Sequence, residues 1–509
     1  MVVSTINERS FQAFARQQGC QPPLDLTGVW YNRFDRIRQI LNLKKSGKDI
    51  LDDILAADFA KASTVQRTMH EGSQVMTTIE PANLQAVLAT QFDDFATGRL
   101  RYLQLGPILG RSIFTSDGAF WSHSRALFRP QFSRDNINDL EATDKAANAF
   151  VAALGVVDAK GWTDHVDLQP MFFNFTLDTA SDFLFGESLD SQSASRTPEQ
   201  SDVHKLTGMK DVRSQVASKQ FLDDFEILGH TIIMRIRLST LYWTMDSFKF
   251  RAAVKRVRRF TEYYVNKAVE ASMTGDVKGN SGSLLARIAS QTQDREELRN
   301  QTLAILFAGR DTTASLLGWC MLRLSLHPEI LHKLRQIILQ DFDPNEPITF
   351  AKIKGCRYLQ HFLNEVLRVH PTVPLNGRVA TRNTTLPTGG GADGKHPIAV
   401  RKGQLVGFSV YLMQRRKDLW GEDAAEFKPE RWEQKVPAWQ YLPFLGGPRI
   451  CIGQQFALTE ASYLIVRLLQ EFDQFEPVDL AEMRLMRKAL GLTMWPRDGV
   501  KVRLHKAGV

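Results

Sequence analysis

The sequence predicts a mainly α-helical protein with small β-sheets, an α+β fold. Apolar residues recur at helical spacing over long stretches, whereas strand-like segments are short and lie late in the chain. Of the 509 residues, 43% are hydrophobic and 24% are charged, a globular balance that allows a large core. Length alone leaves one to three domains open.

Helical periodicity is clearest in three segments, 139–154, 171–184 and 294–326. The third is the longest. It opens with Asp294 and Glu297, spaced as in a capping box, and ends before Pro328, which cannot continue a helix. Because its middle is apolar on nearly all sides, we expect this helix to cross the interior.

Strands are predicted late in the chain, at 384–387, 398–401, 404–410, 492–494 and 499–504. Three stretches rich in Gly, Ser, Thr and Asp are typical of loops, at 188–203, 274–283 and 388–395. None of these loops is long enough to predict a domain linker.

The charge balance is mildly basic. Lys plus Arg outnumber Asp plus Glu by 64 to 56, for a formal net charge of +8. This small surplus favours an ordinary solvated surface, with a basic patch for an acidic redox partner or anionic lipid as the alternative. Nucleic-acid binding is disfavoured because no stripe of Arg and Lys with interleaved aromatics occurs.

The strongest motif is FLGGPRICIG, from Phe444 to Gly453, followed directly by an apolar helix at 454–469. A cysteine at a helix N-terminus has its thiolate stabilised by the dipole and by free backbone N–H groups. Gly447 and Gly453 allow a tight turn and the approach of a flat ligand. Cys451 is therefore the candidate metal ligand. The other cysteines show no CxxC or zinc spacing and are expected to be inert thiols in a reducing compartment: Cys20, Cys320 and Cys356.

The same string resembles the haem-ligand signature of the cytochromes P450, Phe-x-x-Gly-x-Arg-x-Cys-x-Gly. Every fixed position is matched, by Phe444, Gly447, Arg449, Cys451 and Gly453. The resemblance implies the cytochrome P450 fold, with haem b between a long central helix and the Cys-ligand loop. It also implies that the Cys451 thiolate is the axial ligand of the iron.

Within the long helix, the string AGRDTT places an acid and two hydroxyls among apolar residues. Such groups are costly unless paired, and a threonine can bond a carbonyl one turn back. One interpretation is a satisfied kink near Gly309. The resemblance implies instead an oxygen-activating pair, in which Thr312 holds dioxygen and a water while Asp311 relays protons. We favour this second interpretation, because ionisable groups at such sites commonly serve proton transfer.

Trp121 and Arg125 match the family's Trp-x-x-x-Arg. One helical turn separates them, so both can reach one haem propionate. Arg449 stands where the family places another propionate ligand, and Arg378 is a further candidate. His123 is expected to be an ordinary histidine, at the surface or behind the propionate site.

Glu365 and Arg368 lie three residues apart, on one helix face. Most such pairs are surface ion pairs of little energetic value. In the family they form the Glu-x-x-Arg pair, which is joined by the arginine of a Pro-Glu-Arg segment, here Arg431. The resemblance implies a buried structural network beneath the haem, with no part in the chemistry.

Several stretches resemble the fungal alkane and fatty-acid hydroxylases, among them FDDFATG from Phe92 and NTTLPTGGG from Asn383. This implies a monooxygenase that inserts one oxygen atom of O₂ into an apolar substrate, with electrons from NADPH through cytochrome P450 reductase. Terminal hydroxylation of long-chain fatty acids or alkanes is the leading hypothesis. A fungal secondary-metabolite tailoring monooxygenase is the alternative, and a non-oxygenase haem protein is disfavoured because Asp311 and Thr312 are intact.

The resemblance also places the walls of an apolar substrate pocket, at 102–114, 221–242, Ile305 with Ala308, 372–375 and 492–494. We expect residues 1–30 to lead into a catalytic domain at 31–509. Fungal members usually begin with an endoplasmic-reticulum membrane helix, but residues 1–30 contain no apolar run near the ~20 residues that span a bilayer. Either the sequence is trimmed or the gene lacks the anchor. The protein is then expected at the cytosolic face of that membrane through peripheral contact, or in the cytoplasm.

Overall fold

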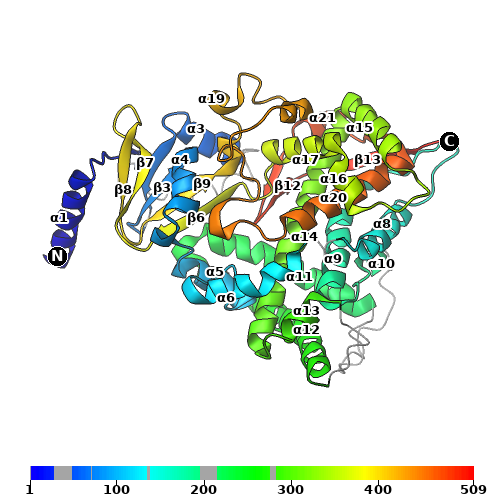
Figure 1. The fold of residues 1–509 in the computed structure, drawn as a ribbon, viewed down its shortest axis with the longest axis horizontal. Coiled ribbons are helices and arrows are strands. Elements are labelled where there is room, and N and C mark those ends of the chain that lie inside the picture. Colours follow the sequence, from blue (N-terminus) through cyan, green and yellow to red (C-terminus); the bar gives the residue numbers. More distant parts are fainter. Residues whose placement is uncertain are drawn as a thin grey trace. The chain divides into compact units, whose positions relative to one another are not determined.

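The structure is a computed structural model that describes residues 2–27, 49–69, 71–133, 138–194, 215–274 and 282–508 (Figure 1). The chain divides into two compact units. The first unit comprises Met1–Gly98 and Leu367–Cys451, and the second comprises Arg99–Val366 and Ile452–Val509. The predicted boundary between residues 30 and 31, and parts of the predicted loops 188–203 and 274–283, lie outside the described residues.

A six-stranded sheet is the main element described in the first unit, with strand order β1-β2-β3-β9-β6-β4. Val65 and Met76 are buried residues of two strands of this sheet that pair antiparallel with each other. Its strands are β1 (Leu24–Asp25), β2 (Thr64–Thr68), β3 (Gln74–Thr78), β4 (Phe95–Ala96), β6 (Leu375–Ala380) and β9 (Leu405–Ser409). A separate hairpin pairs β7 (Thr384–Gly390) with β8 (His396–Val400).

Short helices complete the described part of the first unit. They are α1 (Val2–Gln17), η2 (Ile50–Leu55), α3 (Ala56–Phe59), α4 (Pro81–Gln85), η3 (Ala86–Thr90), η4 (Phe92–Asp94), α18 (Val410–Met413), α19 (Lys417–Trp420), η9 (Pro429–Glu433) and η10 (Gly447–Arg449).

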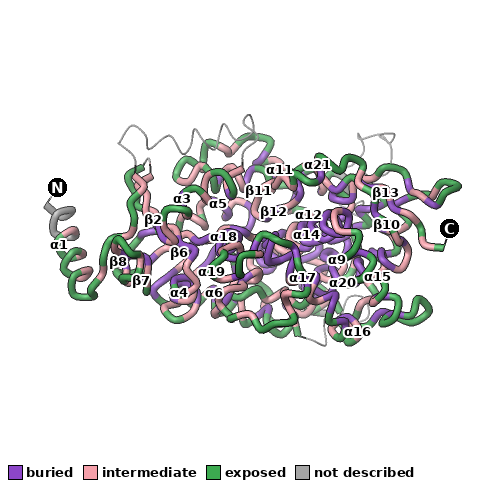
Figure 2. Tube along the Cα trace, turned by 90° about the horizontal axis from the view of Figure 1, so that it is seen from above, coloured by how far each residue is buried: buried purple, intermediate pink, exposed green. Residues whose placement is uncertain are grey.

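The second unit is built around α14 (Arg295–Leu326), which is buried along most of its length (Figure 2). It packs against α9 (Leu168–Phe185), α12 (Phe248–Thr274) and α20 (Gln454–Glu471). Trp319, which is fully buried, donates its indole N–H to the carbonyl of Met494 at 2.8 Å. The prediction that this helix crosses the interior is therefore confirmed.

The remaining described helices of the second unit are α5 (Arg99–Leu109), α6 (Gly118–Phe128), η5 (Arg129–Phe132), α8 (Glu141–Ala153), α10 (Ser191–Ala194), α11 (Gln215–Arg237), η8 (Ser239–Met245), α13 (Leu284–Ala289), α15 (Pro328–Asp341), α16 (Phe350–Gly355) and α21 (Leu480–Arg484). Helix α17 (Arg357–Val369) leads from the second unit into the first. The strands of the second unit are β5 (Val166–Asp167), β10 (Phe472–Pro477), β11 (Lys488–Leu490), β12 (Met494–Pro496) and β13 (Lys501–Lys506). Among the described residues, no helix has the length and apolar character needed to cross a membrane.

Helix α14 begins where the sequence predicts, but only half of its capping box forms. The carboxylate of Asp294 accepts the backbone N–H groups of Glu296 at 2.9 Å and Glu297 at 3.1 Å. The backbone N–H of Asp294, which a capping box would direct to Glu297, donates instead to Oγ1 of Thr292 at 3.3 Å, and the carboxylate of Glu297 lies 3.0 Å from Nε2 of His123. The cap is a simple N-cap, which still satisfies two of the helix's free donors.

The strand and loop predictions need three corrections. Strands do not gather only late in the chain, since β2 and β3 form an early antiparallel pair. The predicted loop 388–395 is partly strand, because β7 continues to Gly390. Asn83 explains this extension: its amide bonds both the N–H and the carbonyl of Thr388, at 3.2 and 2.9 Å, and so holds the glycine-rich run in an extended form. The segment 492–494 is mostly the connection into β12, which starts at Met494.

Candidate active site

Cys451 is an exposed residue of the signature loop, in the first unit. The loop folds back on itself, since the N–H of Cys451 donates to the carbonyl of Phe444 at 3.1 Å and that of Ile450 to Gly447 at 3.1 Å. A short 3₁₀ turn, η10, ends at Arg449. Helix α20 begins three residues after Cys451, at Gln454, as the sequence predicts.

Gly447 is the tightest point of this loop. Its φ is +70°, a conformation that L side chains rarely adopt. A Cβ at this position would lie 1.8 Å from the carbonyl oxygen of Leu88 in η3. The contact is with backbone, which cannot move aside as a flexible side chain can, so only glycine fits.

The chemistry of the four cysteines separates Cys451 from the rest. Cys320 and Cys356 are buried. Burial raises the pKa of the Cys356 thiol to about 11 and the pKa of the Cys320 thiol well above its usual value. Burial also raises the pKa of Cys20. Since the thiolate is the form that binds metals, the exposed Cys451 is the one whose setting fits a haem ligand.

Two arginines that the sequence predicts as propionate ligands lie in the first unit, Arg449 and Arg378, and their side chains make different contacts. Arg449 lies in the Cys451 loop, with its guanidinium carbon 5.9 Å from the ring centre of Phe92. Arg378 is buried on β6 and donates to Oδ1 of Asn376 at 3.0 Å and to the carbonyl of Gly377 at 2.8 Å. Its own strand thus fixes the Arg378 guanidinium.

Of the three residues of the predicted network, Glu365 and Arg368 are buried and Arg431 is partly buried. Glu365 and Arg368 have no exposed surface. Arg368 donates to the carbonyls of three residues that follow β9: Gln414 at 3.1 Å, Ala424 at 2.7 Å and Glu426 at 2.9 Å. Arg431 binds the same stretch, through the carboxylate of Asp423 at 2.9 Å. The two arginines therefore fold the segment 414–426, which agrees with a structural role.

In the second unit, Asp311 and Thr312 are partly buried neighbours on α14. The hydroxyl of Thr312 donates to the carbonyl of Ala308 at 2.8 Å, one turn back. Asp311 lies 3.1 Å from Nη1 of Arg310. Burial raises the pKa of the Asp311 carboxyl, and the adjacent Arg310 opposes that shift. An acid whose pKa is moved towards neutrality suits proton transfer.

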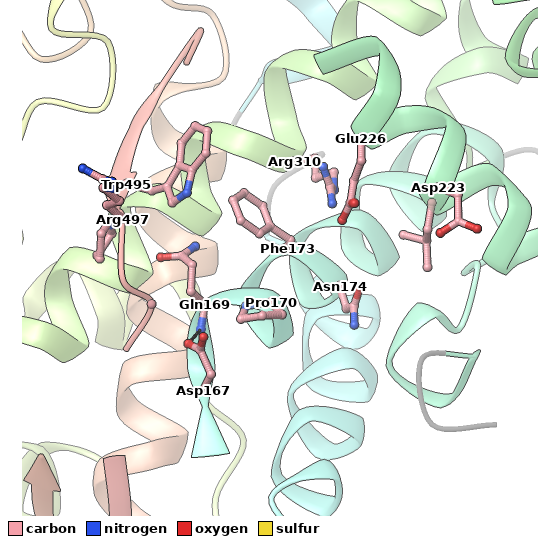
Figure 3. A pocket seen from close by; sticks show the side chains of 13 residues that line it. Asp167, Gln169, Pro170, Phe173, Asn174, Asp223, Glu226, Arg310, Trp495 and Arg497 are labelled. Carbon is pink, nitrogen blue, oxygen red and sulfur yellow. Dashed lines mark hydrogen bonds between the residues drawn. The ribbon is translucent and has the colours of Figure 1, made fainter. Parts of the chain in front are cut away.

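Arg310 lines a cavity of about 460 Å³ within the second unit (Figure 3). Its guanidinium carbon lies 4.8 Å from the ring centre of Phe173, which meets Trp495 edge-on at 5.9 Å. In Figure 3 the carboxylate of Glu226 points towards the same part of the cavity as the Arg310 guanidinium. Nε of Arg310 and Oε1 of Gln169 are buried, with no hydrogen-bond partner among the described residues.

Trp121 and Arg125 both lie on α6, Trp121 buried and Arg125 half-buried. Helix α6 is tied to α14 by Gln301, whose amide donates to Oγ of Ser124 at 2.5 Å. His123 is an exposed residue that contacts Glu297, in agreement with its prediction as an ordinary surface histidine.

Sequence reasoning missed Glu460, a carboxyl on α20 with only 3% exposure. The hydroxyls of Thr179 on α9 and Thr313 on α14 donate to it. Burial raises the pKa of Glu460 to about 8, although these two hydrogen bonds oppose the shift. The signal available in the sequence was an acidic residue within the apolar run 454–469. Its contact with Thr313, the residue after Thr312, is visible only in the structure.

Comparison with known proteins settles the family. The sequence model of the cytochrome P450 family matches residues 35–502. The chain belongs to the cytochrome P450 family. Cytochrome P450 52A10 of Candida maltosa is 41% identical, over 96% of this chain and 93% of its own. Cytochrome P450 monooxygenase g430 of a Fusarium species is also 41% identical, over 94% of this chain and 84% of its own. The crystal structure of cytochrome P450DA heme domain has the same fold, with a TM-score of 0.74 at 20% identity over 96% of this chain and 98% of that one.

Membership of this P450 family confirms the predicted fold class, the enzyme class and haem as the cofactor. It also implies O₂, a substrate and a redox partner. The similarity to proteins of fungal species agrees with the resemblance noted in the sequence. The roles of individual residues, and the position of haem between α14 and the Cys451 loop, stay predictions.

Replacing Gly447 with alanine tests the tight point of the Cys451 loop. Gly447→Ala adds a backbone clash to the cost of a positive φ, so we expect a lower melting temperature and poor haem retention. Gly403→Ala is the matched control, because Gly403 has a φ of +84° but no atom within 4 Å of its Cβ position. It should show only the conformational cost of ~1–2 kcal/mol. Equal losses in the two variants would contradict a close approach at Leu88.

Glu460 should make stability depend on pH. The folded protein holds its proton up to about pH 8, whereas the ordinary value of 4.5 applies to the unfolded chain. The free energy of unfolding therefore falls as pH rises between these values. Glu460→Gln, neutral at every pH, should gain in melting temperature relative to wild type from pH 5 to 8. The exposed Glu476→Gln serves as control, and a difference between Glu460→Gln and wild type that stays constant with pH would refute the assignment.

Proposed function

We propose that this protein is a haem-thiolate monooxygenase that hydroxylates long apolar chains, with fatty acids or alkanes as substrates and terminal carbon as the preferred position. Electrons would come from NADPH through cytochrome P450 reductase. The observation that carries the monooxygenase part is the acid–alcohol pair Asp311–Thr312 on the buried α14. The substrate part rests on the resemblance to fungal alkane and fatty-acid hydroxylases.

Haem supplies the oxidising chemistry when it is bound, and the chain supplies position and electrostatics. Cys451 would be the axial ligand. The propionates would be held by Trp121 and Arg125 on α6 and by Arg378 and Arg449 in the first unit. Gly447 shapes the loop that presents Cys451, and Phe444 anchors that loop through its carbonyl. Gly453 caps α20, which follows the loop.

Asp311 and Thr312 would manage protons. The Thr312 hydroxyl already has a backbone acceptor, so it keeps its side-chain oxygen free to accept one more hydrogen bond. Asp311 is paired with Arg310, whose guanidinium reaches the polar cavity of Figure 3. Water in that cavity can exchange protons with this pair, which gives Asp311 a supply from solvent.

Apolar side chains in the second unit support a long apolar substrate. Phe225 of α11 stacks on Phe307 of α14 with ring centres 3.9 Å apart. Phe221 and Ile305 are buried nearby in these helices. Such walls offer contact area but few hydrogen bonds, so they suit a hydrocarbon chain better than a polar metabolite.

We further propose that the protein sits on the cytosolic face of the endoplasmic-reticulum membrane through an apolar patch formed by Ile236, Leu241, Trp243 and Phe248, all exposed. Exposed cations flank this membrane patch, among them Arg237, Lys249 and Arg251. Aromatic side chains with neighbouring cations are typical of surfaces that meet lipid headgroups.

The proposed function is tested by measuring how tightly NADPH consumption is coupled to product formation. Thr312→Ala removes the hydroxyl, so NADPH use should continue while product per NADPH falls at least about tenfold. Ser325→Ala is the matched control, because its hydroxyl makes the same bond one turn back on α14, to Met321 at 2.8 Å. Unchanged coupling in Thr312→Ala would contradict the proposed pair. A screen of fatty acids, alkanes and terpenoids by spectral shift identifies the substrate, and shifts with terpenoids alone would favour the secondary-metabolite enzyme.

The membrane patch is tested with vesicles of phosphatidylcholine, with and without phosphatidylserine. Phe248 and Val156 are both 89% exposed, but Val156 lies outside the patch. Phe248→Ser should weaken vesicle binding by about tenfold, from the apolar burial that is lost. Val156→Ser should not weaken it. Equal binding by the two variants would overturn the proposal.

A further inference from the structure

Arginines from other helices bond backbone carbonyl groups in the second half of α5, which contains Pro107. Arg235 of α11 donates from Nη2 to Leu103 and from Nε to Gln104, both at 2.7 Å. Arg258 of α12 donates to Pro107 at 2.8 Å. Pro107 has no N–H, so the carbonyl of Leu103 lacks its partner one turn on, and the carbonyl of Pro107 lies in the last turn, where no helical donor remains. Side chains of α11 and α12 therefore bond the backbone of α5.

Arg235 is the centre of this arrangement. Only 1% of its surface is exposed, and burial lowers the pKa of its guanidinium. Its Nη1 bonds the carboxylate of Asp246, which follows η8. Its guanidinium carbon also lies 4.8 Å from the ring centre of Tyr242. One side chain thus joins α5, α11 and the η8 segment.

A second polar contact runs in the opposite direction. The amide of Gln104 on α5 donates to the carbonyl of Ser239 at the start of η8, at 3.3 Å. On its other side, α5 leads into Gly110, where a Cβ would lie 2.3 Å from the side chain of Asn300 on α14. Helix α5 therefore lies against α14 near Gly110 and is bonded to α11 and η8 through Arg235 and Gln104.

We infer that Arg235 is a positioning residue that locks α5 to α11 and thereby controls how readily a long apolar ligand enters the substrate pocket. The inference rests on the proposed function in one respect, the placement of pocket walls on segments 102–114 and 221–242. The joint is polar, buried and concentrated in one side chain. Loss of the Asp246 carboxylate leaves a buried cation without its counter-charge, which weakens the joint far more than loss of one apolar contact.

The chain contains a matched control. Arg256 of α12 makes a bidentate pair with Asp224 of α11, at 2.7 and 2.6 Å, and Asp224 is as buried as Arg235. Both bonds join α11 to α12, and neither involves α5. Asp224→Asn therefore removes a buried carboxylate from the same helix without altering the α5 joint.

The test is stopped-flow binding of two iron ligands to the haem-loaded protein. Imidazole is small, whereas an imidazole with an octyl chain must pass the pocket walls. For Asp246→Asn and Arg235→Met we expect the on-rate and off-rate of octylimidazole to rise by about tenfold, the scale of one charged hydrogen bond. The rates for imidazole should not change in either variant. Asp224→Asn lies within the predicted wall 221–242 but bonds α12, so it should change the octylimidazole rates less than Asp246→Asn does.

Unchanged octylimidazole rates in a folded Asp246→Asn would overturn the inference, as would an equal acceleration in Asp224→Asn. Asp246→Asn keeps the test decisive if Arg235→Met fails to fold. Because both probes bind the iron, their rates do not depend on the natural substrate. Altered octylimidazole rates without any fatty-acid or alkane shift would contradict the proposed substrate and leave the role of Arg235 intact.

Discussion

The close approach of Gly447 to the Leu88 carbonyl is the constraint on which the proposed chemistry depends. It fixes the loop whose internal hydrogen bonds, from Cys451 to Phe444 and from Ile450 to Gly447, present the thiol at the surface of its unit. The other three cysteines have pKa values raised by burial. Backbone geometry, more than the cysteine itself, therefore selects which thiol can serve as a metal ligand.

Helix α14 carries polar side chains through an apolar interior. Thr312 bonds its own helix, Asp311 pairs with Arg310, and the hydroxyl of Thr313 reaches Glu460 on α20. Each group is satisfied by a neighbour, so the helix stays regular from Arg295 to Leu326. The same pairing leaves an acid with a raised pKa close to a polar cavity, which is what a proton relay requires.

The sequence predicted the features that depend on local pattern. The long helix, its Asp294 cap and the helix after Cys451 follow from periodicity and capping residues, and the signature string identified the family. Features that depend on distant residues were not predictable. Strand β7 continues into a glycine-rich run because Asn83 bonds its backbone. The carboxylate of Glu297 lies next to His123 and does not complete the capping box. Glu460 and Arg235 matter through partners on other helices, which periodicity cannot reveal.

The spectrum of the reduced, CO-bound protein decides whether Cys451 is the thiolate ligand of the haem iron. Wild type and Cys320→Ala should both show the Soret band of thiolate ligation, because Cys320 is buried in the second unit. Cys451→Ala should bind CO without that band or fail to retain haem. A Cys451→Ala protein that keeps the thiolate band would contradict the account.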